Sequence, residues 1–159
     1  MPSAKLNLCD YNMDMKISTL ETERLILREI SLDDAPSLQK YINNWNVVQY
    51  LSYGVPWPYP EGGALDYMRN VAMPALAADE ITHWVITPKF GEEQGKAVGV
   101  IGYRGLKTDE VDRGFWLGEL YHGKGLMTEA VIATQDYMFF EYGLERLVVR
   151  NAIINTASR

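Results

Sequence analysis

Three short segments rich in β-branched and aromatic residues follow one another in the middle of the chain, and they limit its possible folds more than any other feature. They cover residues 81–87, 97–106 and 111–117, and the stretch between the first two is rich in glycine and charged residues. Short segments of this composition, separated by turn residues, are typical of antiparallel strands joined by hairpins. We therefore predict an antiparallel three-stranded meander at the centre of the fold.

A strand and a helix are predicted before this meander. Residues 22–30 have the composition of a strand, and Ser31 and Asp34 have the spacing of a capping box. The helix that this box would begin extends to about residue 44. Pro36 is compatible with such a helix only in its first turn.

Two more helices and a last strand complete the predicted order. Residues 61–77 and 125–142 have helical patterns, with Gly143 as the C-cap of the second helix. Residues 144–153 have the pattern of a strand. The resulting order β-α-α-β-β-β-α-β predicts an α+β fold with helices on the faces of one sheet.

Size and charge narrow the range of functions. The 159 residues correspond to one domain, and 21 acidic against 15 basic residues give a formal charge of −6 that disfavours nucleic acid as a partner. No stretch approaches the ~20 apolar residues of a membrane span, so no membrane partner is expected. The single cysteine, Cys9, and the lack of a signal-like leader favour the cytoplasm. Residues 1–17 show no helical or strand period and are predicted to form a flexible N-terminal extension.

The most informative stretch for function is a glycine-containing turn between a strand and a helix, over residues 115–130. The first N–H groups of a helix have no acceptor within the helix, and with the positive end of the helix dipole they favour an anion. Gly123 and Gly125 carry no Cβ, so a bulky diphosphate can approach the backbone there. The alternative is that the two glycines only make a tight turn.

A nucleoside-triphosphate P-loop is excluded at this turn. Gly118-x-x-x-x-Gly123-Lys124 has the right spacing, but Gly125 follows where the motif requires the Ser or Thr that binds Mg²⁺. The only later strand candidate also ends without the acidic residue that such an enzyme needs.

The chain resembles the GNAT N-acetyltransferase superfamily, and within it the branch of ribosomal-protein N-terminal acetyltransferases. In the superfamily's coenzyme A loop, Gln/Arg-x-x-Gly-x-Gly/Ala, His122 takes the first position, Gly125 the second and Met127 the last. The resemblance to the branch runs from Thr19 to Arg159 and rests on motifs in register: Thr22-Glu23-Arg24-Leu25-Ile26-Leu27-Arg28, Asp33-Asp34-Ala35, Gly114-Phe115-Trp116-Leu117 with Gly123-Lys124-Gly125-Leu126-Met127-Thr128-Glu129-Ala130, and Asn155-Thr156-Ala157-Ser158-Arg159.

The resemblance implies a fold and a cosubstrate. The fold is a mixed, mostly antiparallel sheet with helices on both faces, and the cosubstrate is acetyl-coenzyme A, with no metal. The coenzyme would lie in a V-shaped opening between the fourth and fifth strands, with its diphosphate on the glycine turn. The amide of Leu117 or Gly118 is the candidate donor to the thioester oxygen. The residues assigned to coenzyme binding are Trp116, Leu117, Gly118, His122, Gly123, Lys124, Gly125, Leu126, Met127, Thr128 and Asn155.

Three residues are candidates for proton transfer. Glu119 follows the strand that would bind the oxyanion, and it is the first candidate for the base that accepts a proton from the amine. His83 is an alternative base, and Ser158 is a candidate proton donor near the coenzyme sulfur. Each has an ordinary structural alternative: a solvated loop acid, a structural strand histidine and a helix-start hydroxyl.

The acceptor site is predicted in the segment 50–60, which is rich in proline and aromatic residues. Its rings could clamp a peptide terminus or a small amine, although they could also simply close the core. The residues assigned to this site are Tyr50, Tyr53, Trp57 and Tyr59, together with Phe115.

We therefore expect acetyl transfer from acetyl-coenzyme A to a primary amine, by direct attack on the thioester. The amine would belong to a protein N-terminus or to a small molecule such as an antibiotic or a polyamine. The alternative is a non-catalytic coenzyme A-binding or interaction domain, because residues 18–159 would lack the last helix and strands of the family fold. The last strand would then have an open edge, which predicts a homodimer, a less stable and weakly active form, or a fragment.

Overall fold

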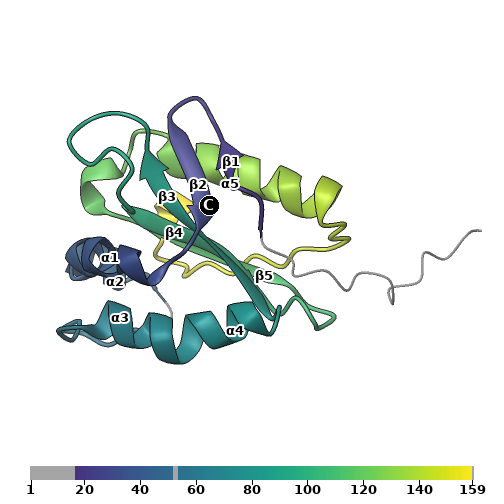
Figure 1. The fold of residues 1–159 in the computed structure, drawn as a ribbon, viewed down its shortest axis with the longest axis horizontal. Coiled ribbons are helices and arrows are strands. Elements are labelled where there is room, and N and C mark those ends of the chain that lie inside the picture. The colour runs from purple at the N-terminus through teal and green to yellow at the C-terminus, as the bar shows by residue number, and fades with distance from the viewer. Residues whose placement is uncertain (1–16, 52–53, 159) are drawn as a thin grey trace, which may run out of the picture.

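The structure is a computed structural model, and it describes residues 17–51 and 54–158 (Figure 1). Residues 1–16 of the predicted extension, and Tyr53 of the predicted acceptor site, lie outside the described residues. Ile17, the last residue of that extension, is half-buried against the core. In the part of the chain that is described, no helix is long and apolar enough to cross a bilayer.

The centre of the fold is one antiparallel sheet whose five strands follow the order of the chain. The predicted meander is confirmed, because β3 pairs with β4 and β4 with β5. Trp84 lies opposite Ile101, and Ile101 lies opposite Phe115, so these three side chains share one face. The strands are β1 (Leu20–Glu21), β2 (Leu25–Glu29), β3 (Ile81–Pro88), β4 (Gly99–Arg104) and β5 (Asp112–Leu117).

The predicted strand over residues 22–30 begins later than expected, because a turn precedes it. Leu20 of β1 lies opposite Leu27 of β2, and residues 22–24 connect the two strands. The Thr22 hydroxyl accepts the Leu25 N–H at 3.0 Å, so this backbone group bonds to a side chain instead of to a neighbouring strand. A hairpin therefore replaces the beginning of the single strand.

The helices lie in the three predicted segments, except for α2, which follows the first of them and was not predicted. The Asp34 carboxylate accepts the Ser31 N–H at 2.9 Å, which is one half of the predicted capping box, and Pro36 lies in the first turn. A π-helical turn precedes Pro74 in the second predicted helix, and Gly143 ends the third with a φ of 82°. The helices are α1 (Ala35–Ile42), α2 (Trp45–Val48), α3 (Gly63–Tyr67), η3 (Met68–Ala72), α4 (Met73–Ala77), α5 (Leu126–Asp136) and η5 (Tyr137–Glu141).

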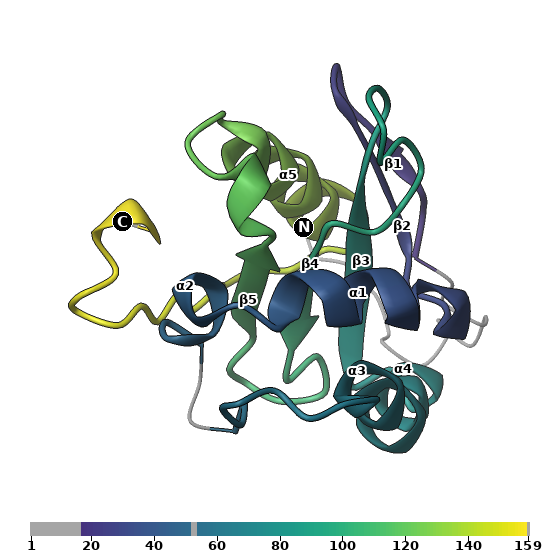
Figure 2. The ribbon, with the colours of Figure 1, turned by 90° about the vertical axis from the view of Figure 1, so that its left-hand side faces the viewer.

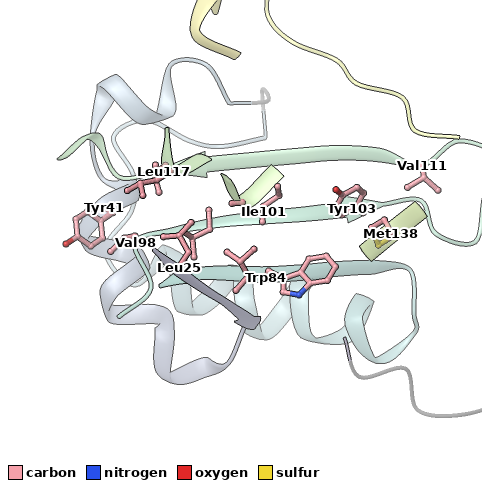
Figure 3. Close-up of a cluster of buried hydrophobic side chains, with 13 residues drawn as sticks. Leu25, Tyr41, Trp84, Val98, Ile101, Tyr103, Val111, Leu117 and Met138 are labelled. Atoms are coloured by element: carbon pink, nitrogen blue, oxygen red, sulfur yellow. The ribbon is translucent and has the colours of Figure 1, made fainter. Parts of the chain in front are cut away.

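Helices cover both faces of the sheet, as predicted. Figure 1 shows α5 on one side of the strands and α3 with α4 on the other. Trp84, Ile101 and Tyr103 of the sheet and Met138 of η5 are fully buried in one cluster between the sheet and the helices α5 and η5 (Figure 3). The opposite face carries a second cluster, in which Val85 packs with residues of α1 and α3.

The predicted last strand over residues 144–153 is wrong. The pairing of this segment within the described chain is a single parallel bridge between Val148 and Asp112, where the Val148 N–H donates to the Val111 carbonyl at 2.8 Å. The apolar pattern of the segment suggested a strand, but only its first part packs on the core, through Leu144 and Leu147, and Ile153 at its end is 82% exposed. Among the residues that the structure describes, no strand therefore covers the outer edge of β5 after this bridge.

Candidate functional site

The open edge of β5 leads directly into the glycine turn. After the bridge at Asp112, no described strand pairs with this edge, although the His122 ring lies 2.7 Å from the Leu117 carbonyl there. Figure 2 shows the segment that follows α5, in yellow, passing β5 and then leading away from the sheet. An unpaired strand edge presents N–H and C=O groups that can bind an extended ligand as an added strand.

Two hydrogen bonds show which backbone groups face outward. The Gly118 N–H donates to the Val98 carbonyl at 2.8 Å, which is toward β4. Because directions alternate along an antiparallel strand, Leu117 turns its N–H and C=O to the open edge, and its carbonyl lies 2.7 Å from His122 Nε2 there. The Gly118 amide is therefore not free to bind an oxyanion, which corrects one of the two predicted donors. Leu117 is the remaining candidate.

The turn between β5 and α5 needs glycine for its backbone conformation. Gly123 and Gly125 have φ values of 69° and 75°, and Gly125 is the N-cap of α5. Glycine adopts this left-handed region at little cost, unlike other residues. A Cβ on Gly123 would meet no atom within 4 Å, so the space beside the turn is open. The backbone conformation of the tight turn is sufficient reason for glycine at both positions, and the open space beside Gly123 leaves room for a ligand.

The start of α5 presents a row of unpaired donors. Within residues 17–51 and 54–158, the backbone N–H groups of residues 123–128 have no hydrogen-bond acceptor. The next N–H group, that of Glu129, donates to the Gly125 carbonyl at 3.1 Å. Unpaired N–H groups at the positive end of a helix dipole bind anions. This part of the site is therefore suited to a phosphate-bearing ligand.

A hollow of about 280 Å³ lies beside the turn. Its lining includes the two cations of Arg24 and Lys124 and the rings of Phe90 and Tyr121. The Lys124 ammonium donates to the Leu120 carbonyl at 2.8 Å, so it also fixes the loop. Arg24 is paired with Glu129, so Lys124 supplies the positive charge that has no carboxylate partner among the described residues, and this charge and the two rings suit a ligand that carries both a phosphate and an aromatic base.

The side chains of the predicted coenzyme set differ in what they can contact. Leu126 is buried in the core and Met127 is half-buried against it, so their backbone groups are what they offer to a ligand. Thr128 is exposed at the start of α5, where its hydroxyl is accessible. The His122 ring is held by the Leu117 carbonyl, and Trp116 packs against both core clusters.

One ion pair, whose role the sequence did not indicate, holds the start of α5. Glu129 Oε2 accepts Arg24 Nε at 2.7 Å, and Glu129 Oε1 accepts the Arg24 N–H at 2.8 Å and the Thr22 hydroxyl at 2.5 Å. Arg24 also donates to the Lys124 carbonyl at 2.8 Å. Burial raises the pKa of the Glu129 carboxyl, but the bonds from Thr22 and Arg24 outweigh it and leave that pKa lowered. The hairpin after β1 is thereby fastened to the glycine turn.

Glu119, the predicted base, is exposed on the surface just after β5, and each of its carboxylate oxygens accepts one hydrogen bond. Its Oε2 accepts Asn44 Nδ2 at 2.7 Å, and its Oε1 accepts Asn46 Nδ2 at 2.6 Å. These two bonds lower the pKa of the Glu119 carboxyl. Asn44 Oδ1 in turn accepts the Asn46 N–H at 2.9 Å as the N-cap of α2. The carboxylate therefore links α2 to the loop that leads to the glycine turn.

His83, the alternative base, lies in β3, two strands away from the open edge. Burial, together with the charge of Arg104, lowers its pKa to about 4. Its Nδ1 is buried without a hydrogen-bond partner among the described residues. The imidazole is therefore neutral at pH 7, and the structure does not bring it to the open edge of β5.

The predicted acceptor rings fall into two groups. Trp57 is 45% exposed and its ring lies 5.5 Å from that of Trp45, centroid to centroid. Tyr59 packs against the cluster under α1 and α3, whereas Phe115 packs against the cluster under α5. Because Phe115 lies on the opposite face of the sheet, it is not part of one site with Tyr59, contrary to prediction. Trp45 was missed, because a single tryptophan in a short helix carries no sequence signal for a site.

The predicted residues at the end of the chain lie in a short helical turn. Ser158 belongs to η6 (Thr156–Ser158), and its carbonyl accepts Asn151 Nδ2 at 3.0 Å. The Ser158 N–H points back to the Asn155 carbonyl at 3.4 Å. No hydrogen bond in the described chain joins this turn to Glu119 or to the glycine turn. Nor does any group of three His, Cys, Asp or Glu side chains, among the residues described, have the arrangement to hold a metal ion.

Comparison with known proteins supports the family suggested by the motifs. A family model described as acetyltransferase (GNAT) domain matches residues 24–159. A relative named uncharacterized N-acetyltransferase p20, from Bacillus licheniformis, is 28% identical over 145 residues, which cover 89% of this chain and 78% of the relative.

Solved structures share the fold. RimL, described as a ribosomal L7/L12 alpha-N-protein acetyltransferase, superimposes in its apo form with a TM-score of 0.70 at 20% identity, covering 86% of this chain and 72% of RimL. RimL in complex with coenzyme A gives a TM-score of 0.70 at 19% identity, covering 86% and 76% of the two chains. At this level of identity the likeness is one of fold.

Proposed function

The chain belongs to the GNAT acetyltransferase domain family, and from this we propose that it transfers the acetyl group of acetyl-coenzyme A to a primary amine. One observation carries the proposal: the open edge of β5 continues into the unpaired N–H groups at the start of α5. The edge suits the extended pantetheine arm, and the helix start suits the diphosphate. A cytoplasmic location stays a prediction from the sequence.

The residues of the site fit this coenzyme without further change. When bound, the coenzyme supplies an activated acetyl group as a thioester. The N–H groups of residues 123–128 hold the diphosphate, and the exposed Thr128 hydroxyl adds a donor. Arg24 and Lys124, with the rings of Phe90 and Tyr121, offer charge and stacking surfaces to the nucleotide end.

The Leu117 amide is the proposed donor to the negative charge that develops on the thioester oxygen. It lies on the open edge, and the His122 ring fixes the carbonyl of the same residue at 2.7 Å. A backbone donor that is already oriented stabilises such charge without reorganisation, and one donor is worth roughly 3 kcal/mol in other enzymes. Ser158 as proton donor and His83 as base remain predictions.

We propose a peptide N-terminus as the acceptor. Support comes from the fold shared with RimL, whose name states that it acetylates the α-amine of a ribosomal protein. It also comes from Trp45 and Trp57, which form an exposed pair of rings near α2. Small amines are the alternative acceptors, and non-catalytic coenzyme A binding is the alternative function.

Release of coenzyme A thiol from acetyl-coenzyme A tests this proposal. A short peptide with a free N-terminal serine or alanine should support thiol release, and the same peptide with a blocked N-terminus should not. Thiol release with small amines alone would move the acceptor to that class. Binding of acetyl-coenzyme A without thiol release on any amine would favour the non-catalytic alternative.

A further inference from the structure

The Glu119 carboxylate stands between two parts of the site that are far apart in the chain. Its two oxygens accept the side-chain amides of Asn44 and Asn46, at 2.7 and 2.6 Å. A flip that exchanges Oδ1 and Nδ2 of Asn44 would break the cap of α2, because Oδ1 accepts the Asn46 N–H there. The carboxylate thus has two defined donors, both from the region around α2.

These contacts fit poorly with a base. A general base needs an oxygen that can approach the amine, and a pKa close to that of the working pH. Each oxygen of Glu119 already accepts one bond from an asparagine amide, and these two bonds stabilise the ionised carboxylate and lower its pKa. The carboxylate is held as a fixed acceptor rather than prepared to take a proton.

The helix at the other end of these bonds carries an aromatic side chain. Trp45 lies between Asn44 and Asn46, and its ring contacts that of Trp57 at 5.5 Å. Glu119 is itself the second residue after β5, which ends at Leu117, and it begins the loop that leads to the glycine turn. A continuous set of contacts therefore runs from the proposed coenzyme loop to the proposed acceptor surface.

We propose that Glu119 is a positioning residue that couples coenzyme binding at the glycine turn to the placement of α2 and its Trp45 at the acceptor surface. This inference rests on the proposed function. Ordering of the loop by the coenzyme fixes the carboxylate, and the carboxylate fixes both asparagines.

The coupling is tested by two substitutions that exchange the acceptor at position 119 and the donor at position 44, made singly and together. Glu119→Gln has one acceptor oxygen, so one asparagine amide then faces another NH₂ group. Asn44→Asp keeps the α2 cap, since Asp and Asn cap equally well, but it sets a second carboxylate against Glu119. In the double variant the new glutamine donates to the new aspartate, so both bonds re-form with the same net charge.

Each single variant should lower kcat/KM for the peptide acceptor by about tenfold, and the double variant should recover most of this loss. A loss in the acceptor's KM, with the coenzyme's dissociation constant little changed, is the expected pattern. If Glu119 is instead the base, the double variant stays as slow as Glu119→Gln, because no carboxylate remains at that position. That result overturns the proposal.

A second measurement needs no acceptor. The N–H groups of Val47 and Val48 donate to the Asn44 carbonyl, and that of Gln49 donates to the Trp45 carbonyl. The hydrogen exchange of these three groups therefore reports how firmly α2 is held. Coenzyme A should slow this exchange in the wild-type protein and in the double variant, but not in Glu119→Gln. Coenzyme binding without this response overturns the coupling alone, whereas absence of coenzyme binding overturns the proposed function and the coupling with it.

Discussion

Replacement of Glu129 by glutamine tests whether the ion pair with Arg24 holds the start of α5. The carboxylate accepts three bonds, from Arg24 Nε, the Arg24 N–H and the Thr22 hydroxyl. Glutamine keeps one accepting oxygen for the last two and turns an NH₂ group toward Arg24 Nε. The lost bond involves charged groups and is worth roughly 1.5–3 kcal/mol when buried. Because the Arg24 side chain is 43% exposed, water compensates in part, and we expect a loss of about 1–2 kcal/mol.

Thermal unfolding at pH 7 measures this loss. For a domain of this size, 1 kcal/mol corresponds to roughly 2–4 °C, so Glu129→Gln should lower Tm by about 2–8 °C. Glu23→Gln is the matched control, because it removes the same charge from an exposed position in the neighbouring turn, and that side chain has no bond or ion pair in the described chain. Equal effects of the two substitutions would refute the reasoning.

The pH dependence of the difference in stability between the wild-type protein and Glu129→Gln gives a second test. A carboxyl whose pKa is lowered on folding contributes stability above its unfolded pKa, about 4.3 for glutamate, and loses it as the pH falls through the lower folded value. The wild-type advantage over Glu129→Gln should therefore be complete at pH 7 and disappear in strong acid. An advantage that persists at a pH well below 4 would show that the bonds do not depend on ionised Glu129.

Two further predictions concern the buried histidine and the exposed rings. As the pH falls from 6.5 to 4, the wild-type protein should lose about 3 kcal/mol of stability, because unfolding lets the buried neutral imidazole of His83 take a proton. Denaturant titrations of His83→Leu should not show this loss. An unchanged pH dependence would exclude His83 as its source. Trp57→Ala should raise the acceptor's KM with little effect on coenzyme affinity, whereas Phe140→Ala, at an 84% exposed site on η5, should change neither; equal kinetics of the two variants would exclude Trp57 from the acceptor surface.

The parts of the fold that the sequence predicted are those set by local patterns. The meander of β3, β4 and β5 follows from short β-rich segments separated by turns, and its strands pair in chain order. The failure at residues 144–153 has the opposite cause. An apolar alternation shows that a segment could be a strand, but whether a neighbouring strand and a surface to pack on exist depends on the rest of the fold.

For the site, the sequence located the loop but not the direction of its groups. Gly123 and Gly125 could be recognised, because a left-handed backbone selects glycine. The choice between the Leu117 and Gly118 amides depends on which strand each faces, and that is known only from the register with β4. The pairing of Arg24 with Glu129 spans 105 residues, so no local pattern could reveal it.

Calorimetric titration with acetyl-coenzyme A tests the central claim, that the glycine turn binds the coenzyme, most directly. Gly125→Val and Gly62→Val form a matched pair, because both residues are N-caps of helices with left-handed φ values, 75° and 72°. Both variants pay a similar cost in backbone strain, but only the first places a branched side chain at the proposed diphosphate site. The wild-type protein and Gly62→Val should bind, and Gly125→Val should bind more than about tenfold more weakly, a difference of at least ~1.4 kcal/mol. No binding to the wild-type protein, or equal binding to the two variants, would contradict the account.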